Sequence, residues 1–274
     1  MNRIAVIGLG IIGGSICASL SKAGYLVDGM DLCEKTIEIA REKGYICDKA
    51  ENIADYDVVF IAVPPKATIS LLENTAFKDG AVVADICGVK SAVEKCVLSK
   101  PRNYRYVGMH PMAGKETSGI ESASPDLFNN ANLVITTCES TDKNALLVIK
   151  NYAKAMRFGR IVMCSAEEHD KKIALTSQLA HIVSNAYVKS PQVKNCKGFT
   201  GGSFQDMTRI AGVDENIWTE LYMENREFIL KELDGLMEQL AIYRDALAKQ
   251  DEEALSDALK DGRLIRQNIK YKRV

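Results

Sequence analysis

Three glycines near the start of the chain have the spacing that dinucleotide binding requires. Gly8, Gly10 and Gly13 form a G-x-G-x-x-G segment. A β-branched apolar run at residues 3–7 precedes it and a helical pattern up to Gly24 follows it, which is the setting that this motif needs. The first glycine permits a tight turn, the second lets backbone amides approach a pyrophosphate, and the third lets helix and strand pack closely.

The residues after these glycines predict the rest of a cofactor site. Ile11 and Ile12 open the helix, whose N-terminus offers unpaired N–H groups and a positive dipole end to phosphates. Asp31 closes the next strand, about 20 residues further on, where a carboxylate can bind the ribose hydroxyls of NAD. Residues 32–34 include no arginine for a 2′-phosphate, so we expect NAD rather than NADP. The structural alternatives are a turn without a ligand and an aspartate that only caps a helix.

The chain has three histidines, and one of them stands where acid–base chemistry is plausible. His110 follows a predicted strand at residues 106–109 and opens a turn rich in proline and glycine. At the ligand-binding edge of a sheet such a histidine can act as an acid or a base. The alternative is a histidine whose hydrogen bonds only fix the turn.

The other two histidines lie on one predicted helix. His169 and His181 are twelve residues apart, roughly 18 Å along a helix, so they cannot bind one metal ion, and we expect no metal site. We expect His169, near the helix start, to be a surface or interface group. His181, among apolar residues, is either a core histidine or one that reaches into a cleft.

The segment 198–209 is the remaining unusual stretch, because its glycines and hydroxyl residues interrupt a helical region. It ends with Arg209, which can hold a substrate carboxylate through two parallel hydrogen bonds. A salt bridge from Arg209 to Asp206 or Asp214 is the competing interpretation.

Strands and helices that alternate must position these residues. A run of β-branched residues ends at Val63 and Pro64, and proline stops a strand at the carboxyl edge, where doubly wound sheets bind ligands. A capping box at residues 91–94 predicts the start of one helix. The alternation predicts a mostly parallel Rossmann-type sheet in a nucleotide-binding domain, residues 1–164. The predicted strands are residues 3–7, 25–30, 57–63, 81–85, 106–109, 133–137 and 160–163, and the predicted helices between them include 36–43, 66–76 and 142–157.

The pattern changes after Cys164, and residues 165–274 are predicted to form an all-helical domain. A second capping box at residues 165–168 opens a helix that runs towards Tyr187. Apolar residues at helical spacing predict one long helix over 217–247, and a last helix covers 252–269. A domain of this size cannot bury a broad apolar face alone, so we expect a homodimer through it.

Composition excludes several classes of function. Hydrophobic residues make up 47% and charged residues 26%, as in ordinary globular proteins, and the net charge of −1 argues against nucleic acid or an anionic membrane as partner. No apolar run is long enough to span a membrane. The eight cysteines include no C-x-x-C and no signal-peptide pattern precedes Arg3, so we expect reduced thiols in a cytoplasmic protein with a small-molecule substrate.

Taken together, these segments resemble the prephenate dehydrogenase family, which includes the arogenate dehydrogenases. The resemblance covers essentially the whole chain, and the His110 turn and the Arg209 segment are more specific than the glycine motif. The segments that carry it are the glycine loop at 8–15, the strand end at 62–65, the turn at 110–114 with Glu116, Ser118 and Gly119, the pair His169 and Asp170, His181, and residues 202–211.

The resemblance implies oxidative decarboxylation of prephenate to 4-hydroxyphenylpyruvate with reduction of NAD⁺. His110 would accept a hydrogen bond from the ring 4-hydroxyl, while hydride leaves from C4 and loss of CO₂ makes the ring aromatic. Arg209 would bind a substrate carboxylate, and His181 would help to hold the substrate side chain. Glu116 would lie at the cleft mouth, and Asp206 would orient Arg209 or cap the next helix.

The sequence departs from the family pattern at residues that would surround the substrate. Gly88 stands where serine is frequent in an Asp-x-x-Ser-Val-Lys motif, so a hydroxyl at this substrate contact is missing. Lys115 replaces a common serine or threonine, and Gln178 and Ala180 replace histidine and proline. These changes leave the preference between prephenate and arogenate open.

Two other functions compete with this interpretation. One is another dehydrogenase with a helical second domain, such as a β-hydroxyacid dehydrogenase or pyrroline-carboxylate reductase, but these share the glycine motif and not the His110 turn. The other is a regulatory protein that binds NAD without turnover. The combination of His110, His181 and Arg209 argues against a sensor, which has no need of all three.

Overall fold

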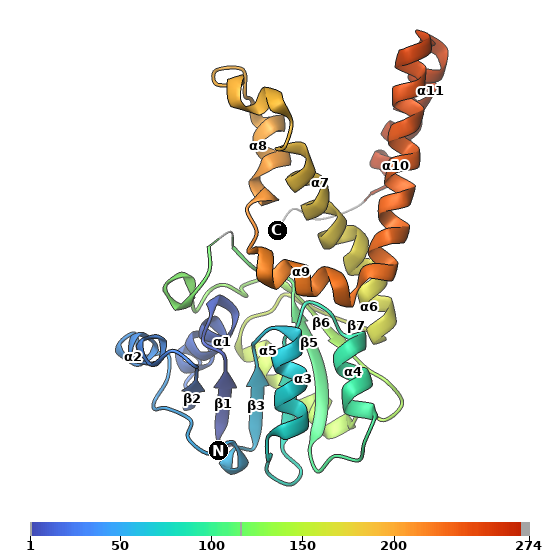
Figure 1. The fold of residues 1–274 in the computed structure, drawn as a ribbon. Helices are drawn as coiled ribbons and strands as arrows, with labels where there is room; N and C mark the ends of the chain where they lie inside the picture. Colours follow the sequence, from blue (N-terminus) through green and yellow to red (C-terminus); the bar gives the residue numbers. More distant parts are fainter. Residues whose placement is uncertain (1, 116, 270–274) are drawn as a thin grey trace.

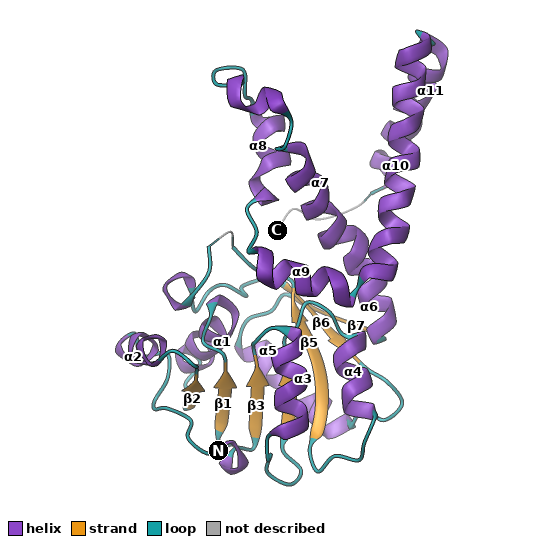
Figure 2. Cartoon of the chain, viewed as in Figure 1, coloured by secondary structure: helices purple, strands orange, loops and turns teal. Residues whose placement is uncertain are grey.

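The computed structural model describes residues 2–115 and 117–269. Seven strands form one sheet in the order β2-β1-β3-β4-β5-β6-β7 (Figures 1 and 2). All neighbouring strands are parallel except β5 and β6, which are antiparallel, so the mostly parallel sheet is confirmed. The strands are β1 (Ile4–Ile7), β2 (Val27–Met30), β3 (Val58–Ile61), β4 (Val82–Asp85), β5 (Arg105–Pro111), β6 (Asn132–Thr136) and β7 (Arg160–Cys164).

Helices cover both faces of this sheet, which explains why its central strands are apolar throughout. Along β1, Ile4 and Val6 belong to one hydrophobic cluster, whereas Ala5 and Ile7 belong to the cluster on the opposite face. Strands buried on both faces read as continuous apolar runs. The helices of this part are α1 (Ile11–Lys22), α2 (Glu34–Glu42), α3 (Pro65–Asn74), α4 (Ser91–Leu98) and α5 (Lys143–Ala155).

The second part of the chain is helical and rises from the carboxyl edge of the sheet. In Figure 1, α9 lies across this edge, while α7 with α8 and α10 with α11 project away as two arms. Its elements are α6 (Ala166–Ile173), a π-helical segment (Ala174–Leu179), α7 (Ala180–Tyr187), α8 (Gly202–Thr208), α9 (Glu215–Glu224), α10 (Arg226–Lys249) and α11 (Glu252–Asn268). No helix among residues 2–115 and 117–269 is long and apolar enough to cross a membrane.

The prediction of one continuous helix over residues 217–247 was wrong. Asn225 interrupts it between α9 and α10, with backbone angles of φ −116° and ψ 18°. The buried side-chain amide of Asn225 donates hydrogen bonds to the backbone oxygen of Asp170 and to Oε1 of Gln178. A contact with another element therefore fixes the break, and the apolar spacing along the helices does not reveal it.

Carboxylates from the helical part cap two helices of the part that contains the sheet. The capping box predicted at Ser91 is wrong, because Ser91 is the first residue of α4 and the carboxylate of Asp170 accepts from the N–H groups of Lys90 and Ser91, at 2.8 Å each. Glu220 in α9 accepts from the N–H of Lys66 at the start of α3. Helix N-termini favour negative charge, so these contacts dock the two parts together. By contrast, Ser165 caps α6 as predicted.

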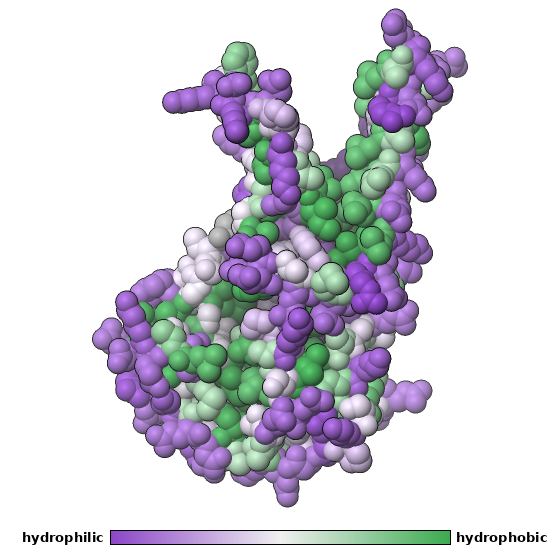
Figure 3. Space-filling view, in the orientation of Figure 1, coloured by the Kyte–Doolittle hydropathy of each residue, from purple (hydrophilic) through white to green (hydrophobic). Residues whose placement is uncertain are grey.

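The two arms carry many apolar side chains on their surface. Figure 3 shows apolar residues along α10, on the side that faces the gap between the arms. Leu230, Met237, Leu240 and Leu247 are exposed and follow one another at intervals of seven, three and seven residues, which puts them on one side of α10. Within α10, only Ile229 and Ala246 are buried. This part of the molecule leaves most of its apolar face uncovered in the single chain.

Candidate active site

The glycine loop has the geometry that its spacing predicts. Gly8 has φ +89°, which favours glycine, and a Cβ atom at Gly13 would lie 1.8 Å from the backbone oxygen of Gly8. A Cβ atom at Gly10 would meet nothing within 4 Å, so the backbone there is open to a ligand. The first N–H groups of α1, at Ile11 and Ile12, have no acceptor within a helix. The loop thus presents backbone donors to a space that a pyrophosphate can enter.

Asp31 holds the glycine loop from its neighbouring strand. Its carboxylate accepts from the N–H of Leu9, at 2.8 Å, and from the N–H of Cys33, at 2.9 Å. Cys33, not Asp31, is the N-cap residue of α2. Each carboxylate oxygen has two acceptor sites, so Asp31 keeps capacity for ribose hydroxyls after making these two bonds.

The end of β3 packs directly against this loop. A Cβ atom at Gly8 would lie 2.5 Å from the backbone oxygen of Ala62 and 2.6 Å from Cγ1 of Val63. Pro64 is exposed and precedes α3, which starts at Pro65. Val63 and Pro64 therefore border the same ligand-binding edge as the glycines.

A cavity of about 480 Å³ lies where the carboxyl edge of the sheet meets the helical part. It brings together Ile11 of the glycine loop, Gly88 after β4, and His110 of β5 with His181 and Arg209 of the helical part. Five predicted site residues that are far apart in the sequence thus share one cavity. Glu116 lies outside the residues that the structure describes. No group of His, Cys, Asp and Glu within residues 2–115 and 117–269 could hold a metal ion.

His110 lines this cavity and belongs to a chain of hydrogen bonds. Its Nδ1 lies 2.8 Å from Nε2 of His169, and Nδ1 of His169 lies 2.7 Å from Oδ1 of Asp170. A Cβ atom at Gly88 would lie 3.9 Å from Nε2 of His110, so this nitrogen is on the Gly88 side. Burial, His169 and the Lys90 ammonium hold the pKa of His110 well below its ordinary value. His110 is therefore neutral near pH 7 and able to accept a proton.

The expectation that His169 is a surface or interface group was wrong. His169 is 2% exposed, and it joins His110 to Asp170. Burial is the main cause that lowers its pKa. The adjacent His169 and Asp170 at the start of a helix were the available sign of a functional role. The local spacing does not indicate that His169 contacts a strand residue 59 positions away in the chain.

His181 reaches the cavity, which decides between its two predicted environments. Its ring is half-buried and lies against Trp218, with ring centroids 4.0 Å apart. Its Nδ1 is 3.0 Å from the backbone oxygen of Ser177, in the π-helical segment. Such segments are frequent at functional sites. Trp218 also lines the cavity, and its apolar helical spacing in the sequence gives no sign of a role at the site.

Arg209 follows α8 on a segment that α7 holds in place. The hydroxyl of Ser184 donates to the backbone oxygen of Met207, and the amide of Asn185 donates to that of Ala211. Asp214 lines the cavity too, and its carboxylate caps α9 by accepting from the N–H groups of residues 216 and 217. Lys115, another lining residue, donates from Nζ to the backbone oxygen of Ser122.

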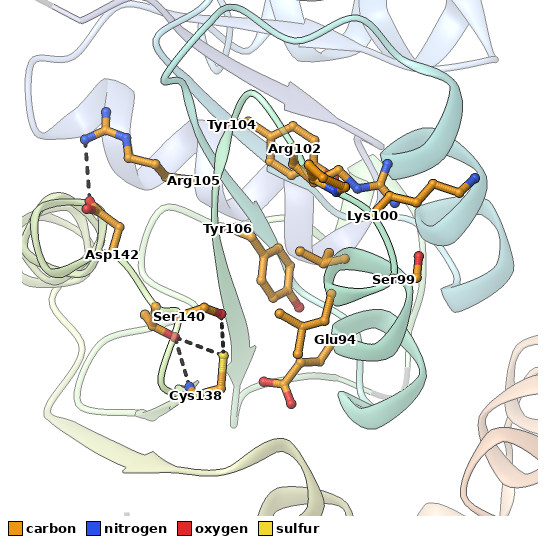
Figure 4. A pocket seen from close by; sticks show the side chains of 14 residues that line it. Glu94, Ser99, Lys100, Arg102, Tyr104, Arg105, Tyr106, Cys138, Ser140 and Asp142 are labelled. Atoms are coloured by element: carbon orange, nitrogen blue, oxygen red, sulfur yellow. Dashed lines mark hydrogen bonds and ion pairs between the residues drawn. The ribbon is translucent and has the colours of Figure 1, made fainter.

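A second cavity, of about 440 Å³, lies beside β5 and α4 and holds none of the predicted site residues. Figure 4 shows its side chains, among them Glu94, Tyr106 and Cys138. The Arg105 guanidinium and the Asp142 carboxylate form an ion pair across 3.5 Å at its edge. Its charges are mixed and partly paired, whereas the first cavity joins a base, a cation and the glycine loop. We therefore take the first cavity as the candidate active site.

Comparisons with known proteins agree with this arrangement. The family model described as prephenate dehydrogenase, nucleotide-binding domain, matches residues 16–163, and that described as prephenate dehydrogenase, dimerization domain, matches residues 165–261. The chain belongs to the prephenate dehydrogenase family. This membership rules out the other dehydrogenase families that share the glycine motif.

Several members of the family are similar to the chain over nearly its whole length. Prephenate dehydrogenase of Lactococcus lactis is 31% identical, over 97% of this chain and 77% of that protein. Cyclohexadienyl dehydrogenase of Zymomonas mobilis is 30% identical, over 98% of this chain and 96% of that protein. The structure of A. aeolicus prephenate dehydrogenase with hydroxyphenyl propionate and NAD⁺ has a TM-score of 0.83 and 29% identity, over 98% of this chain and 99% of that one.

Proposed function

We propose that this protein is an NAD-dependent oxidoreductase that converts prephenate to 4-hydroxyphenylpyruvate by oxidative decarboxylation, a step of tyrosine biosynthesis. The observation that carries the proposal is the shared cavity, in which a neutral His110 and the Arg209 guanidinium lie at the edge where the glycine loop begins. Family membership and the relatives named prephenate dehydrogenase support it.

The residues at the glycine loop fit a dinucleotide. The N–H groups of Ile11 and Ile12 would bind the pyrophosphate, for which Gly8, Gly10 and Gly13 leave room. Asp31 would bind the adenosine ribose, and Val63 and Pro64 would border the bound cofactor. When bound, NAD⁺ supplies the acceptor for the hydride that leaves C4 of the substrate ring.

The side chains of the cavity then perform the remaining work. His110 accepts the proton of the ring 4-hydroxyl at Nε2, so that a carbonyl can form at C4. Arg209 holds one carboxylate of the substrate through charge-assisted hydrogen bonds. The aromatic wall of His181 and Trp218 packs against the substrate and excludes water from it. The electron pair of the bond between the ring and its carboxylate makes the ring aromatic as CO₂ leaves, which drives the reaction forward. The 4-oxygen then takes the proton back from His110, which gives the phenol of the product and restores the neutral histidine.

Arogenate is the alternative substrate, and it differs by an ammonium group where prephenate has a keto group. An ammonium group in a cavity needs a carboxylate partner. Asp214 is the one carboxylate in the described part of the cavity lining, and two backbone N–H groups already bind it. This distribution of charge favours prephenate over arogenate.

The test is NAD⁺ reduction by the purified protein, followed by absorbance with prephenate and with arogenate in parallel. We expect turnover with prephenate and little with arogenate. The control is His110→Asn, which should bind NAD⁺ with unchanged affinity but lower kcat about 10²- to 10⁴-fold, because it lacks the base. Turnover only with arogenate would reverse the substrate assignment, and NAD⁺ binding without turnover of either substrate would favour a sensor.

We also propose that the protein acts as a homodimer, joined through the helical part, in the cytoplasm. The exposed apolar residues of α10 need a partner, and the family model that matches residues 165–261 is described as a dimerization domain. All eight cysteines are free thiols, in keeping with a reducing compartment.

A further inference from the structure

We propose that Asp170 and His169 are positioning residues that keep the proton of His110 on Nδ1 and so leave Nε2 free as the acceptor in catalysis. This inference rests on the proposed function for its effect on turnover. Its structural content, the location of two protons, stands on the hydrogen bonds alone.

Asp170 fixes the direction of this chain of hydrogen bonds. Its Oδ1 accepts from the N–H of Lys90 and its Oδ2 from the N–H of Ser91, at 2.8 Å each. Hydrogen bonds from His169 and Ser91 lower the pKa of Asp170 against the opposing effect of burial. Asp170 is therefore an ionised carboxylate, which accepts hydrogen bonds and donates none.

These hydrogen bonds allow only one arrangement of protons on the two imidazole rings. Because Oδ1 of Asp170 can only accept, Nδ1 of His169 carries a proton, and its Nε2 is an acceptor in the neutral ring. Nδ1 of His110, 2.8 Å away, must donate to that acceptor. In the neutral ring of His110 the remaining nitrogen, Nε2, carries a lone pair. This nitrogen faces Gly88 and the cavity.

Burial, together with the Lys90 ammonium, keeps both rings neutral. The pKa values of His110 and His169 are lowered by burial first, and the buried ammonium of Lys90 lowers both further. Lys90 is paired with the buried carboxylate of Asp85, which also accepts from the hydroxyl of Tyr106. The Asp170 carboxylate acts in the opposite direction and raises the pKa of both imidazole rings. Asp170 also contributes to the raised pKa of the nearby Glu94. Among the described residues that line the cavity, the other charged or titratable groups are Lys115, His181, Arg209 and Asp214.

The chain of hydrogen bonds from His110 through His169 to Asp170 joins the two parts of the molecule. His110 belongs to the sheet, whereas His169 and Asp170 belong to α6, and Asp170 binds the N-terminus of α4. Asn225, at the break between α9 and α10, holds the backbone oxygen of Asp170. The acceptor state of His110 therefore depends on how the helical part docks on the sheet.

The first experiment locates the protons directly. The chain has three histidines, so a two-dimensional ¹⁵N–¹H spectrum of the imidazole rings contains three spin systems, which His110→Asn and His169→Gln assign. We expect the unsubstituted protein at pH 7.5 to have protonated Nδ1 and bare Nε2 at both His110 and His169. A proton on Nε2 of His110 would overturn the proposal, and no variant is needed for this result.

The second experiment measures kcat and KM in variants of the chain of hydrogen bonds. We expect His169→Leu and Asp170→Asn to lower kcat about 100-fold with KM for the substrate within a few-fold, because His110 then takes up the other tautomer. His169→Gln should retain most of kcat, because its amide oxygen can accept from Nδ1 of His110. In that background Asp170→Asn should have little further effect. Ser165→Ala, which removes the cap of the same helix, is the control and should keep kcat.

The pH profile separates positioning from a loss of structure. As pH falls through the pKa of His110 the ring takes up a proton and kcat/KM falls, so the lowered pKa places this acid limb below about pH 6.5. Asp170→Asn should move the limb to still lower pH, because the carboxylate charge that raises the imidazole pKa is gone. Equal losses in His169→Gln, His169→Leu and Ser165→Ala, with an unmoved limb, would contradict positioning. If the unsubstituted protein turned over neither substrate, the proposed function would fail, while the tautomer spectrum would still decide the proton assignment.

Discussion

The two candidate ligand-binding regions of this molecule are built in different ways. The glycine loop and Asp31 lie within one stretch of 31 residues, and their chemistry is mostly that of backbone N–H groups and one carboxylate. The cavity at His110 is lined by residues between Ile11 and Leu221, which come from the glycine loop, from the edge of the sheet and from several segments of the helical part. The first region is formed by residues close together in the sequence, whereas the second forms only when the helical part docks on the sheet.

The two parts also differ in how they are stabilised. Every residue of β1, β3 and β4 is buried, so the sheet has its own core within one chain. In α9 and α11 no residue is buried, although both helices carry large apolar side chains. A part that leaves apolar surface uncovered depends on a partner for stability. We therefore expect cofactor binding to be independent of assembly, and we expect substrate binding and assembly both to involve the helical part.

The largest effect that tests this contrast concerns assembly. Leu240 is 57% exposed in the apolar row of α10, and Leu240→Glu should raise the dimer dissociation constant by at least about 100-fold, because burying an unpaired carboxylate in an apolar contact is costly. Analytical ultracentrifugation over a range of concentrations measures it. Leu26→Glu, at a site 69% exposed in the nucleotide-binding part, is the matched control and should stay dimeric. If both variants dimerised like the unsubstituted protein, the interface would lie elsewhere. If the affinity for NAD⁺ fell when the dimer dissociated, cofactor binding would not be independent of assembly.

A smaller effect is expected at the arginine of the cavity. Arg209→Ala should raise KM for prephenate about 10- to 100-fold, the equivalent of a lost charge-assisted hydrogen bond, and leave the Kd for NAD⁺ unchanged. Steady-state kinetics and a separate NAD⁺ titration check the two parts of this prediction. Arg226→Ala, at the start of α10 and outside the cavity, is the control and should retain the KM. An unchanged KM in Arg209→Ala would favour a structural ion pair at this residue.

Sequence reasoning succeeded where the determining contacts are close in the chain. The glycine motif, the strands and Ser165 as a cap are decided by residues within a few positions of one another, and the structure has them as predicted. The position of His110 at a strand end followed from the same local patterns.

It failed where the deciding partner is distant. The cap of α4 comes from Asp170, 80 residues further along the chain, and it replaces the predicted Ser91. The break at Asn225 depends on hydrogen bonds to Asp170 and Gln178, and His169 gains its place from a strand of the other part. These three features are connected, because all of them belong to the contacts that α6 and the π-helical segment after it make with α4, β5 and the start of α10. Local periodicity carries no information about that contact.

The smallest of the expected effects concerns cofactor binding at Asp31. Asp31→Ala should weaken NAD⁺ binding about tenfold and narrow the preference for NAD⁺ over NADP⁺, because a carboxylate next to the ribose binds its hydroxyls and repels a 2′-phosphate. The loss is limited because the backbone donors of Ile11 and Ile12 remain, although Leu9 and Cys33 lose their acceptor. Titration with both cofactors, beside Asp28→Ala as a control on the same strand, measures it. If Asp28→Ala lost the preference for NAD⁺ over NADP⁺, or if Asp31→Ala kept it in full, Asp31 would only hold the loop. If the two regions are separable, KM for prephenate should be unchanged in both variants.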